Sequence, residues 1–390
     1  MKESKKIVFL TFHTWKTKRQ GGFHKFAEYS VKLGYQTIFF TFPRSIFDTF
    51  RRSNVYNFKI NKKLSKGISY EKGRLKNTTL LTLELPIPTR IIHHFPSKIL
   101  NFFGKLSISS FKKYAKLNFS NTDYFVFEST SSVMLVDTIK AMFPESKIIY
   151  RPSDPLIAFK YGKRFYHYEL NILKKADLVL LVNIEGYNLY AKNFSNFSAE
   201  VNYKILSNGV DLNLFRKKYS KPKALKIKNT ALYVGARPID WQVVLKSAQM
   251  AEDINFIIVC PVDTPKSLKK RVREQKNIHH IKGIERNQVP RWVTNSDIII
   301  IPNPKNWYKT RPWGITAKYY QAMAAKKPII SYHDTLELKK FDIPVTYDID
   351  SFVNHVRKVI DKKEIHYKID LNEKDWSNIC KNFFAEIESL

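Results

Sequence analysis

The sequence contains little cysteine, and its apolar runs are short. Its two cysteines, Cys260 and Cys380, cannot build a disulfide framework or a cysteine-rich zinc site, which indicates a reducing compartment. A helix that crosses a bilayer needs about 20 consecutive apolar residues, and no run reaches that length. The apolar run after residues 1–6 is too brief for a secretory signal. We therefore expect a cytoplasmic protein.

Acidic residues are scarce relative to basic ones. The chain has 67 Lys and Arg against 34 Asp and Glu, a formal net charge of +33. This charge favours a polyanionic partner, either nucleic acid, an anionic membrane surface or a phosphorylated substrate. A biased composition is the alternative, because the chain is rich in Lys, Asn, Ile, Phe and Tyr and has only 12 glycines. The charge alone does not identify the partner.

The chain does contain enough apolar residues for two or three domains. It has 390 residues, of which 44% are hydrophobic and 14% aromatic. Short apolar runs alternate with helix-period segments, the pattern of parallel sheets whose strands are buried on both faces. We predict an α/β protein with strands at 7–11, 37–41, 80–83, 124–127, 147–151 and 178–182, and then at 231–235, 255–260, 279–282, 298–302 and 328–332.

A basic, weakly periodic segment interrupted by a proline lies at 216–223 and is typical of a linker, so we place the domain boundary near residues 205–225. We predict an N-terminal domain at 1–205, a second domain at 206–365 and a C-terminal helix at 366–390 that packs back on the body. Two open parallel sheets that face each other bind ligands at the carboxyl ends of their strands. Candidate site residues are therefore expected directly after strands.

The first such place is the basic loop at 13–24, in which Gly21 and Gly22 open a helix. Backbone N–H groups at such a position can hold an anion, although a plain turn has the same sequence. His13 and His24 lie in this loop and are more often ordinary polar residues than catalysts. A GxGxxG dinucleotide motif is absent from the sequence.

Two carboxylates follow strands in the first half. Asp154 comes after the strand at 147–151, in the position of a catalytic base, with Arg151 close enough to keep it ionised. Because Pro155 follows it, Asp154 also suits the cap of a helix N-terminus, and the residues alone favour that role. Glu128, at the end of the preceding strand, has a similar position.

In the second half, Arg237 follows a strand and Lys318 lies in the first turn of a predicted helix. Lys318 can meet a diphosphate together with the helix N-terminus, or it can be one of many solvated lysines. Metal-ligand spacing is lacking, since the adjacent His279 and His280 point in opposite directions on a strand.

Several of these segments resemble the GT-B glycosyltransferases. The segment 313–330 is similar to their sugar-nucleotide helix, 207–211 to their inter-domain element, and Val234 with Gly235 to the first turn of their donor domain. Retaining members carry two glutamates eight positions apart in the first of these segments. Trp313 and Gln321 occupy those positions here, so the retaining apparatus is missing.

A closer resemblance is to the xanthan-type, GumK-like bacterial glucuronosyltransferases. It rests on the motifs at 126–129 and 150–154, on His13 with His24, and on the donor segment, and it covers roughly residues 5–335. It implies a GT-B fold of two Rossmann-like domains facing across a cleft. It also implies an inverting transfer with Asp154 as general base, no metal and no cofactor other than a UDP-sugar co-substrate.

The resemblance also assigns the binding residues. Lys318 would hold the donor diphosphate, and the other donor-binding residues would be Gln321, Arg237, Thr316, Ala317, Asn208 and Asn303. The acceptor side would comprise Gly22, His24 and Glu128. The donor implied is UDP-glucuronate, but Asn303, Arg237 and Ala317 depart from the family pattern. The transferred sugar is therefore left open, with a hexosyltransferase of the same fold as the alternative.

The family's acceptor is a polyprenyl-diphosphate-linked glycan at the cytoplasmic face of the bacterial membrane, which implies a peripheral enzyme of exopolysaccharide or capsule assembly. Two clusters of mixed aromatic and basic residues, at 44–52 and 98–116, fit an anionic membrane surface. A core-facing helix with a solvated basic side is the alternative for each. A basic polyanion-binding module without catalysis is the alternative from another class. Nucleic acid is not the expected partner, because helix-turn-helix, RNP and zinc-finger patterns are absent.

Overall fold

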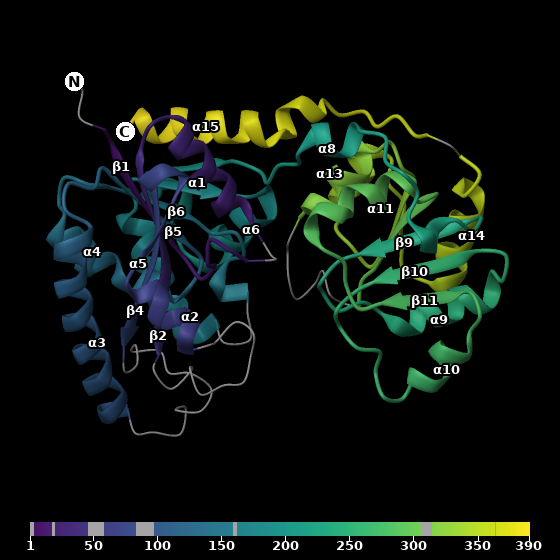
Figure 1. Cartoon of the computed structure of the whole chain (residues 1–390), viewed down its shortest axis with the longest axis horizontal. Helices are drawn as coiled ribbons and strands as arrows, with labels where there is room; N and C mark the ends of the chain where they lie inside the picture. The colour runs from purple at the N-terminus through teal and green to yellow at the C-terminus, as the bar shows by residue number, and fades with distance from the viewer. Residues whose placement is uncertain are drawn as a thin grey trace. The chain divides into compact units, whose positions relative to one another are not determined.

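The computed structural model describes residues 4–17, 20–45, 58–82, 97–158, 162–305, 314–362 and 364–390. The chain forms two compact units. Met1–Leu206 and Cys380–Leu390 make the first, and Ser207–Ile379 make the second. Each unit has a twisted sheet with helices packed against it (Figure 1).

The first unit is built on a mostly parallel sheet. Its described strands follow the order β3-β4-β2-β1-β5-β6-β7-β8, and neighbouring strands are parallel except β3 and β4. The strands are β1 (Lys6–Thr11), β2 (Gln36–Ser45), β3 (Ile68–Tyr70), β4 (Leu75–Thr82), β5 (Tyr124–Glu128), β6 (Lys147–Arg151), β7 (Leu178–Leu181) and β8 (Tyr203–Ile205). The helices are α1 (Gly22–Lys32), α2 (Phe58–Ser65), α3 (Ser97–Asn118), α4 (Val136–Met142), α5 (Gly162–Lys175), α6 (Ile184–Asn193) and α7 (Phe197–Glu200).

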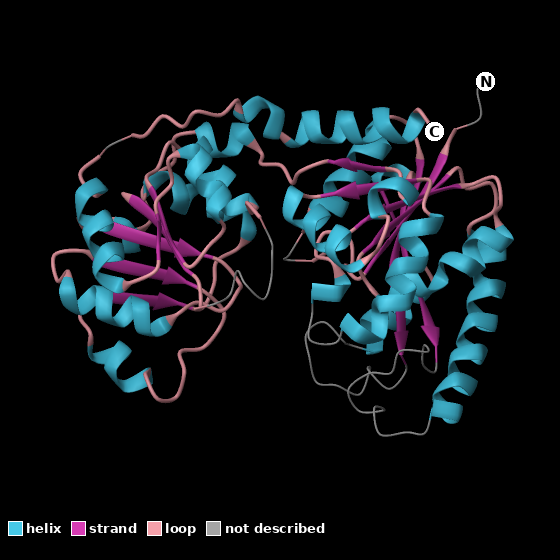
Figure 2. Cartoon of the chain, turned by 180° about the vertical axis from the view of Figure 1, so that it is seen from behind, coloured by secondary structure: helices cyan, strands magenta, loops and turns pink. Residues whose placement is uncertain are grey.

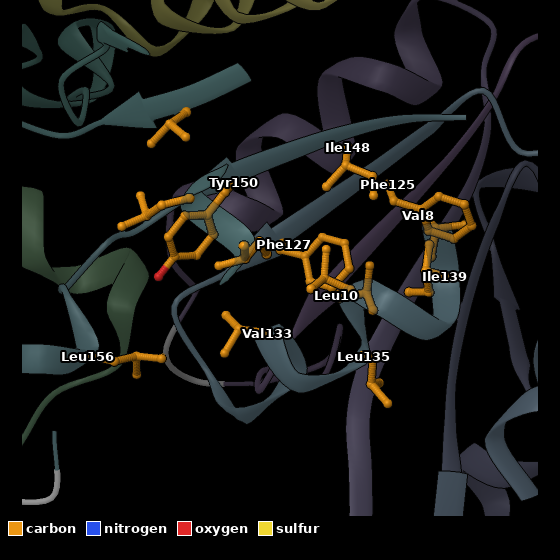
Figure 3. Packing of buried hydrophobic residues seen from close by; sticks show 14 of the residues in the cluster. Val8, Leu10, Phe125, Phe127, Val133, Leu135, Ile139, Ile148, Tyr150 and Leu156 are labelled. Atoms are coloured by element: carbon orange, nitrogen blue, oxygen red, sulfur yellow. The ribbon is translucent and has the colours of Figure 1, made fainter. Parts of the chain in front are cut away.

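The core of this unit explains why the central strands are apolar runs. Alternate residues of β1, β5 and β6 point to one face and pack against Val133, Leu135 and Ile139 (Figure 3). The intervening residues face α1, where Phe9 meets Phe23 with ring centroids 6.1 Å apart. A strand buried on both faces has no solvent side and therefore no polar alternation.

The second unit has a parallel sheet in the order β11-β10-β9-β12-β13-β14 over its described strands, and helices cover both faces (Figure 2). The strands are β9 (Thr230–Val234), β10 (Asn255–Val259), β11 (Ile278–Ile281), β12 (Ile298–Pro302), β13 (Ile329–Tyr332) and β14 (Val345–Thr346). The helices are α8 (Leu212–Arg216), α9 (Trp241–Met250), α10 (Lys269–Glu274), α11 (Val289–Asn295), α13 (Ala317–Ala324) and α14 (Ile349–Val359), and α15 (Trp376–Glu388) begins in this unit and continues from Cys380 in the first. The α/β fold class predicted from the apolar runs is confirmed.

The predicted and observed strands differ at the sheet edges. β4 begins at Leu75, earlier than the predicted run at 80–83, and β3, β8 and β14 were not predicted. β3 and β8 have no fully buried residue. An edge strand that is half exposed carries no apolar run, so composition does not reveal it.

Helix α15 packs its last turns on the first unit. The Phe383 ring stacks on Phe26 of α1 with centroids 4.3 Å apart, and Phe384 stacks on Tyr29 at 5.7 Å. The Tyr35 hydroxyl donates to the Glu388 carboxylate. The C-terminal residues therefore complete the face of the first sheet that α1 covers.

The start of α15 belongs to the second unit and lies on the segment that follows Leu206. The Val210 N–H donates to the Lys374 carbonyl at 2.8 Å. A Cβ added at Gly209 would come within 2.8 Å of the Trp376 ring, so only glycine allows this approach. Among the described residues, no helix is long and apolar enough to cross a membrane.

Candidate active site

The carboxyl ends of β1, β5 and β6 meet at one edge of the first sheet because these strands are adjacent and parallel. This places Thr11, Glu128 and the segment 152–154 side by side. We predicted that site residues lie at or after strand ends, and two such residues, Glu128 and Asp154, lie close together at this edge. The Asp154 carboxylate is close enough to raise the pKa of Glu128.

Glu128 joins the ends of all three strands. Its side chain is 5% exposed and accepts a hydrogen bond from Thr11 and a longer one, 3.5 Å, from Ser153. The His13 Nε2 atom lies 3.9 Å from Glu128 Oε1. Burial, with a contribution from Asp154, raises the pKa of Glu128 to about 7, although the Thr11 hydrogen bond opposes the shift. Near neutral pH this carboxyl group carries a proton for much of the time.

Asp154 is half-buried in the turn after β6, and its N–H donates to Ser129 Oγ at 3.2 Å. The sequence left open whether Asp154 caps a helix. The N–H groups of Leu156 and Ile157, in the following 3₁₀ turn, both donate at 2.9 Å to the Glu169 carboxylate. Glu169 therefore caps this turn, and capping was the alternative role that the sequence offered for Asp154.

Glu169 itself was not predicted as a site residue. It is fully buried on α5 and also accepts hydrogen bonds from Tyr150 at 2.7 Å and Tyr190 at 2.6 Å. Burial raises its pKa in spite of these donors. In the sequence it is a single glutamate on the apolar side of a helix. Its role as a cap becomes visible only with the tyrosines from β6 and α6 that bind it in the folded structure. Glu169 thereby holds the segment next to Asp154 in place.

Arg151 turns toward helix α1, where the guanidinium lies over the Phe26 ring at 5.1 Å from its centroid. Its Nη1 atom donates to the Leu206 carbonyl at 2.8 Å. The side chain is 1% exposed, and burial lowers its pKa to about 10. Arg151 therefore holds the backbone at Leu206, the end of the first segment of this unit. The sequence analysis had placed it next to Asp154 and did not predict this contact.

His24 lies in the first turn of α1, where it is buried and both of its ring nitrogens contact backbone groups. Nδ1 accepts from the Gly21 N–H at 3.1 Å, so Nε2 carries the proton and donates to the Thr14 carbonyl at 3.1 Å. The Trp15 ring stacks on the imidazole, with centroids 5.5 Å apart. His24 therefore shapes this loop, and Gly22 is the first residue of α1. Acceptor contact by either residue stays a prediction.

In the second unit, Lys318 lies in the first turn of α13 and reaches over the end of β9. Its Nζ donates to the Tyr233 hydroxyl at 3.0 Å and lies 4.6 Å from the centre of that ring. A Cβ on Gly235 would come within 2.6 Å of Nζ and of the Tyr233 oxygen. Gly235 is thus required for the amine to occupy this position, which the sequence alone did not show.

Lys318 and Gln321 line the same small pocket, together with Tyr233, Val234, Ile300 and Ala322 among others. These two predicted donor-binding residues are one helical turn apart and face the ends of β9 and β12. The pocket combines one cation, one amide and an apolar wall.

Asn303 directly follows β12 and donates through Nδ2 to Asp334 at 2.6 Å. Asp334 also accepts from Ser331 at 2.9 Å and from Tyr319, the neighbour of Lys318 on α13. Asp334 was not predicted. It ties the predicted residue Asn303 to the helix that carries Lys318 and places a carboxylate beside that helix.

The remaining predicted donor residues lie on loops of the second unit. The Arg237 carbonyl accepts from the Tyr233 hydroxyl at 3.3 Å, which puts this loop beside Lys318. Thr316 is the residue before α13 and Ala317 is its first residue. Asn208 lies two residues before Val210, which bridges to Asp375. Within the described residues, no group of three or more His, Cys, Asp or Glu side chains is placed to hold a metal ion.

Comparisons with known proteins bear on the family and on the fold. Residues 9–182 match the family described as "Glucuronosyltransferase GumK, N-terminal domain", which confirms the predicted resemblance over that segment. No curated protein sequence matches the chain.

The solved structures that resemble the chain are distant in sequence. The α,α-trehalose-phosphate synthase (UDP-forming) of Burkholderia vietnamiensis has a TM-score of 0.67 at 11% identity and covers 99% of each chain. The E. coli trehalose-6-phosphate structure bound with UDP-2-fluoro glucose has a TM-score of 0.66 at 9% identity, and the match also covers 99% of each chain. Anabaena HepE in complex with UDP-glucose has a TM-score of 0.66 at 12% identity, and the match covers 99% of this chain and 100% of the HepE chain. The chain therefore has the GT-B fold, as predicted.

Proposed function

We propose that this chain, a glycosyltransferase of GT-B fold, transfers glucuronic acid from UDP-glucuronate to a polyprenyl-diphosphate-linked glycan and inverts the sugar's configuration. The observation that carries the proposal is the Lys318 amine, held on Tyr233 above Gly235 at the N-terminus of α13. A cation beside a helix N-terminus suits the diphosphate of a nucleotide sugar. The match of residues 9–182 to a glucuronosyltransferase domain supports the choice of sugar.

The mechanism is a single displacement. Asp154 takes the proton of the acceptor hydroxyl, and the oxygen attacks the anomeric carbon of an α-linked donor from the opposite face. The bond from that carbon to the diphosphate oxygen breaks, and the electron pair leaves with the diphosphate. Lys318 and the N-terminus of α13 stabilise the leaving charge, with Arg237 as a further cation, so we propose that no metal is required.

Inversion is proposed because the retaining motif is missing. A solved trehalose-6-phosphate synthase that shares the fold is described as acting with retention. The two positions where retaining enzymes carry glutamates hold Trp313 and Gln321 in this chain. An amide and an indole cannot replace a carboxylate as nucleophile or ion-pair partner.

A hexosyltransferase is the second candidate, and Asp334 favours it. Its carboxylate, bonded to Asn303, adds negative charge in the donor half of the site. Such a charge disfavours the carboxylate of a uronic acid more than it disfavours a neutral sugar.

A thermal-shift screen distinguishes these donors. We expect UDP-glucuronate at a hundredfold excess over its Kd to stabilise the protein by about 2.7 kcal/mol, or roughly 5–10 °C. UDP-glucose, UDP-GlcNAc and GDP-mannose should give smaller shifts. A larger shift with UDP-glucose would move the assignment to the hexosyltransferase. Indifference to every nucleotide sugar would rule out the transferase proposal.

The acceptor's lipid requires a membrane contact, and helix α3 supports one. Lys112, Lys113 and Lys116 are exposed on α3, and Leu117 is 82% exposed. Phe111, which the sequence placed in the same aromatic–basic cluster, is instead buried in the core. The described part of the cluster is thus a core-facing helix with a basic outer side. The side chains at 98–105 and most of the cluster at 44–52 lie outside the described residues.

We propose that this basic side binds the cytoplasmic face of the membrane peripherally. Each lysine near an anionic surface contributes about 1 kcal/mol. Changing Lys112, Lys113 and Lys116 to Gln should weaken binding to phosphatidylserine-containing liposomes roughly 100-fold in flotation at constant salt. The same change at Lys266, Lys269 and Lys276, in the second unit, is the charge-matched control. Equal losses in both variants, or a stronger response to duplex DNA than to liposomes, would contradict the membrane proposal.

A further inference from the structure

The Phe12 ring stands out at the edge that carries Asp154. It directly follows β1 and is 50% exposed. A single exposed apolar residue is common in proteins and does not by itself mark a site. Phe12 differs from other such residues because its surroundings are held by hydrogen bonds. Its backbone N–H donates to the Glu128 carboxylate, which is buried.

The residues on either side of Phe12 are also fixed. Thr11 donates to Glu128, and its Oγ1 accepts from the His13 N–H at 3.1 Å. The His13 carbonyl accepts from Thr41 at 2.7 Å. The His13 imidazole lies against the Phe12 ring, with centroids 3.9 Å apart and planes 35° from parallel. The ring is therefore supported from behind, with part of its surface left open to solvent.

Phe12 and Asp154 lie on opposite sides of Glu128. β1 and β6 both pair with β5, so two strand spacings, roughly 10 Å, separate the ends of β1 and β6. A sugar residue whose hydroxyl reaches Asp154 can extend across Glu128 toward Phe12. The protonated form of Glu128 is neutral and does not repel a polar ligand placed above it.

The chemistry of an aromatic face selects the ligand. The face carries partial negative charge, and the C–H groups on one side of a pyranose ring carry partial positive charge. A sugar therefore gains both buried area and electrostatic attraction on such a ring, whereas a lipid chain gains only buried area. We infer that Phe12 is a stacking platform for a sugar ring of the acceptor. This inference rests on the proposed transferase function and names the acceptor class of the same site.

Two substitutions separate sugar stacking from contact with a lipid chain. Phe12→Trp keeps an aromatic face, and Phe12→Leu keeps an apolar side chain without one. Ile60→Ala, which removes an exposed apolar side chain from α2, is the control. The probes are octyl glycosides of glucose, mannose, galactose and N-acetylglucosamine, observed by saturation-transfer NMR. Their pyranose and octyl protons report separately on the two kinds of contact.

We expect saturation of pyranose protons with the unaltered protein, with Phe12→Trp and with Ile60→Ala. Phe12→Leu should weaken binding of the same glycoside about tenfold. Equal binding by Phe12→Leu, saturation of the octyl protons alone, or no saturation of any pyranose ring would overturn the inference. The melting temperature of each variant is measured with UDP-glucuronate. A donor response without sugar contact refutes the role of Phe12 only, and sugar contact without any donor response refutes the proposed transferase.

Discussion

Asp154→Asn removes sugar transfer while the protein remains folded. A general base contributes about 10²–10⁴-fold to the rate, and an amide cannot accept the hydroxyl proton. The substitution should leave the fold intact, because the Asp154 contact to Ser129 uses the backbone N–H and the following turn is capped by Glu169. We expect kcat to fall by that factor and the melting temperature to change by no more than a few degrees.

The matched control is Asp137→Asn, on the outer side of α4, where the carboxylate is exposed and pairs with Lys175. It removes the same charge and should retain full activity. Glu128→Gln tests the other carboxylate at this edge. Undiminished turnover by Asp154→Asn, or a greater loss with Glu128→Gln, would remove Asp154 from the role of base.

Lys318→Met lowers kcat about 10²–10³-fold, the cost of removing one charged group that stabilises a developing negative charge. Methionine keeps an unbranched stem to pack over the Tyr233 ring, so the loss reports on the ammonium group. The affinity for UDP, measured by calorimetry, should fall as well, because Lys318 would hold the diphosphate in the ground state too. The kcat is measured at saturating donor, and the UDP affinity is measured in the absence of donor.

Gly235→Ala is a second test of the same position, because the added Cβ would overlap Lys318 Nζ and displace the amine without altering the charge. It should reproduce much of the loss. Lys326→Met is the control, since Lys326 follows the same helix but pairs with Glu364 on the surface. If Lys318→Met matched this control in kcat and UDP affinity, the diphosphate would have to bind elsewhere.

The central strands could be predicted from sequence because burial on both faces demands continuous apolar runs. The same runs located Glu128, the last residue of β5, and Asp154, which follows β6, at the edge where a parallel sheet binds ligands. The edge strands β3, β8 and β14 were missed because a short, half-exposed strand has no such signal.

The supporting residues of the site could not be predicted in this way. Glu169 is one of 34 acidic residues, and only its burial beside Tyr150 and Tyr190 shows that it holds the turn after Asp154. Asp334 depends equally on Tyr319 and Asn303, which come from different elements. Such networks join residues that are far apart in the chain, so the local pattern of apolar and polar residues does not reveal them.

The sequence by itself determined the fold class and the places along the chain where chemistry can occur, because apolar periodicity and strand ends are local properties. The tertiary structure decided which of those residues are exposed, which are buried and what each one touches. It placed Phe111 in the core, gave His24 a backbone role and set Lys318 on Tyr233 over Gly235. These outcomes depend on packing between distant segments, where burial and hydrogen-bond geometry determine the role of a side chain.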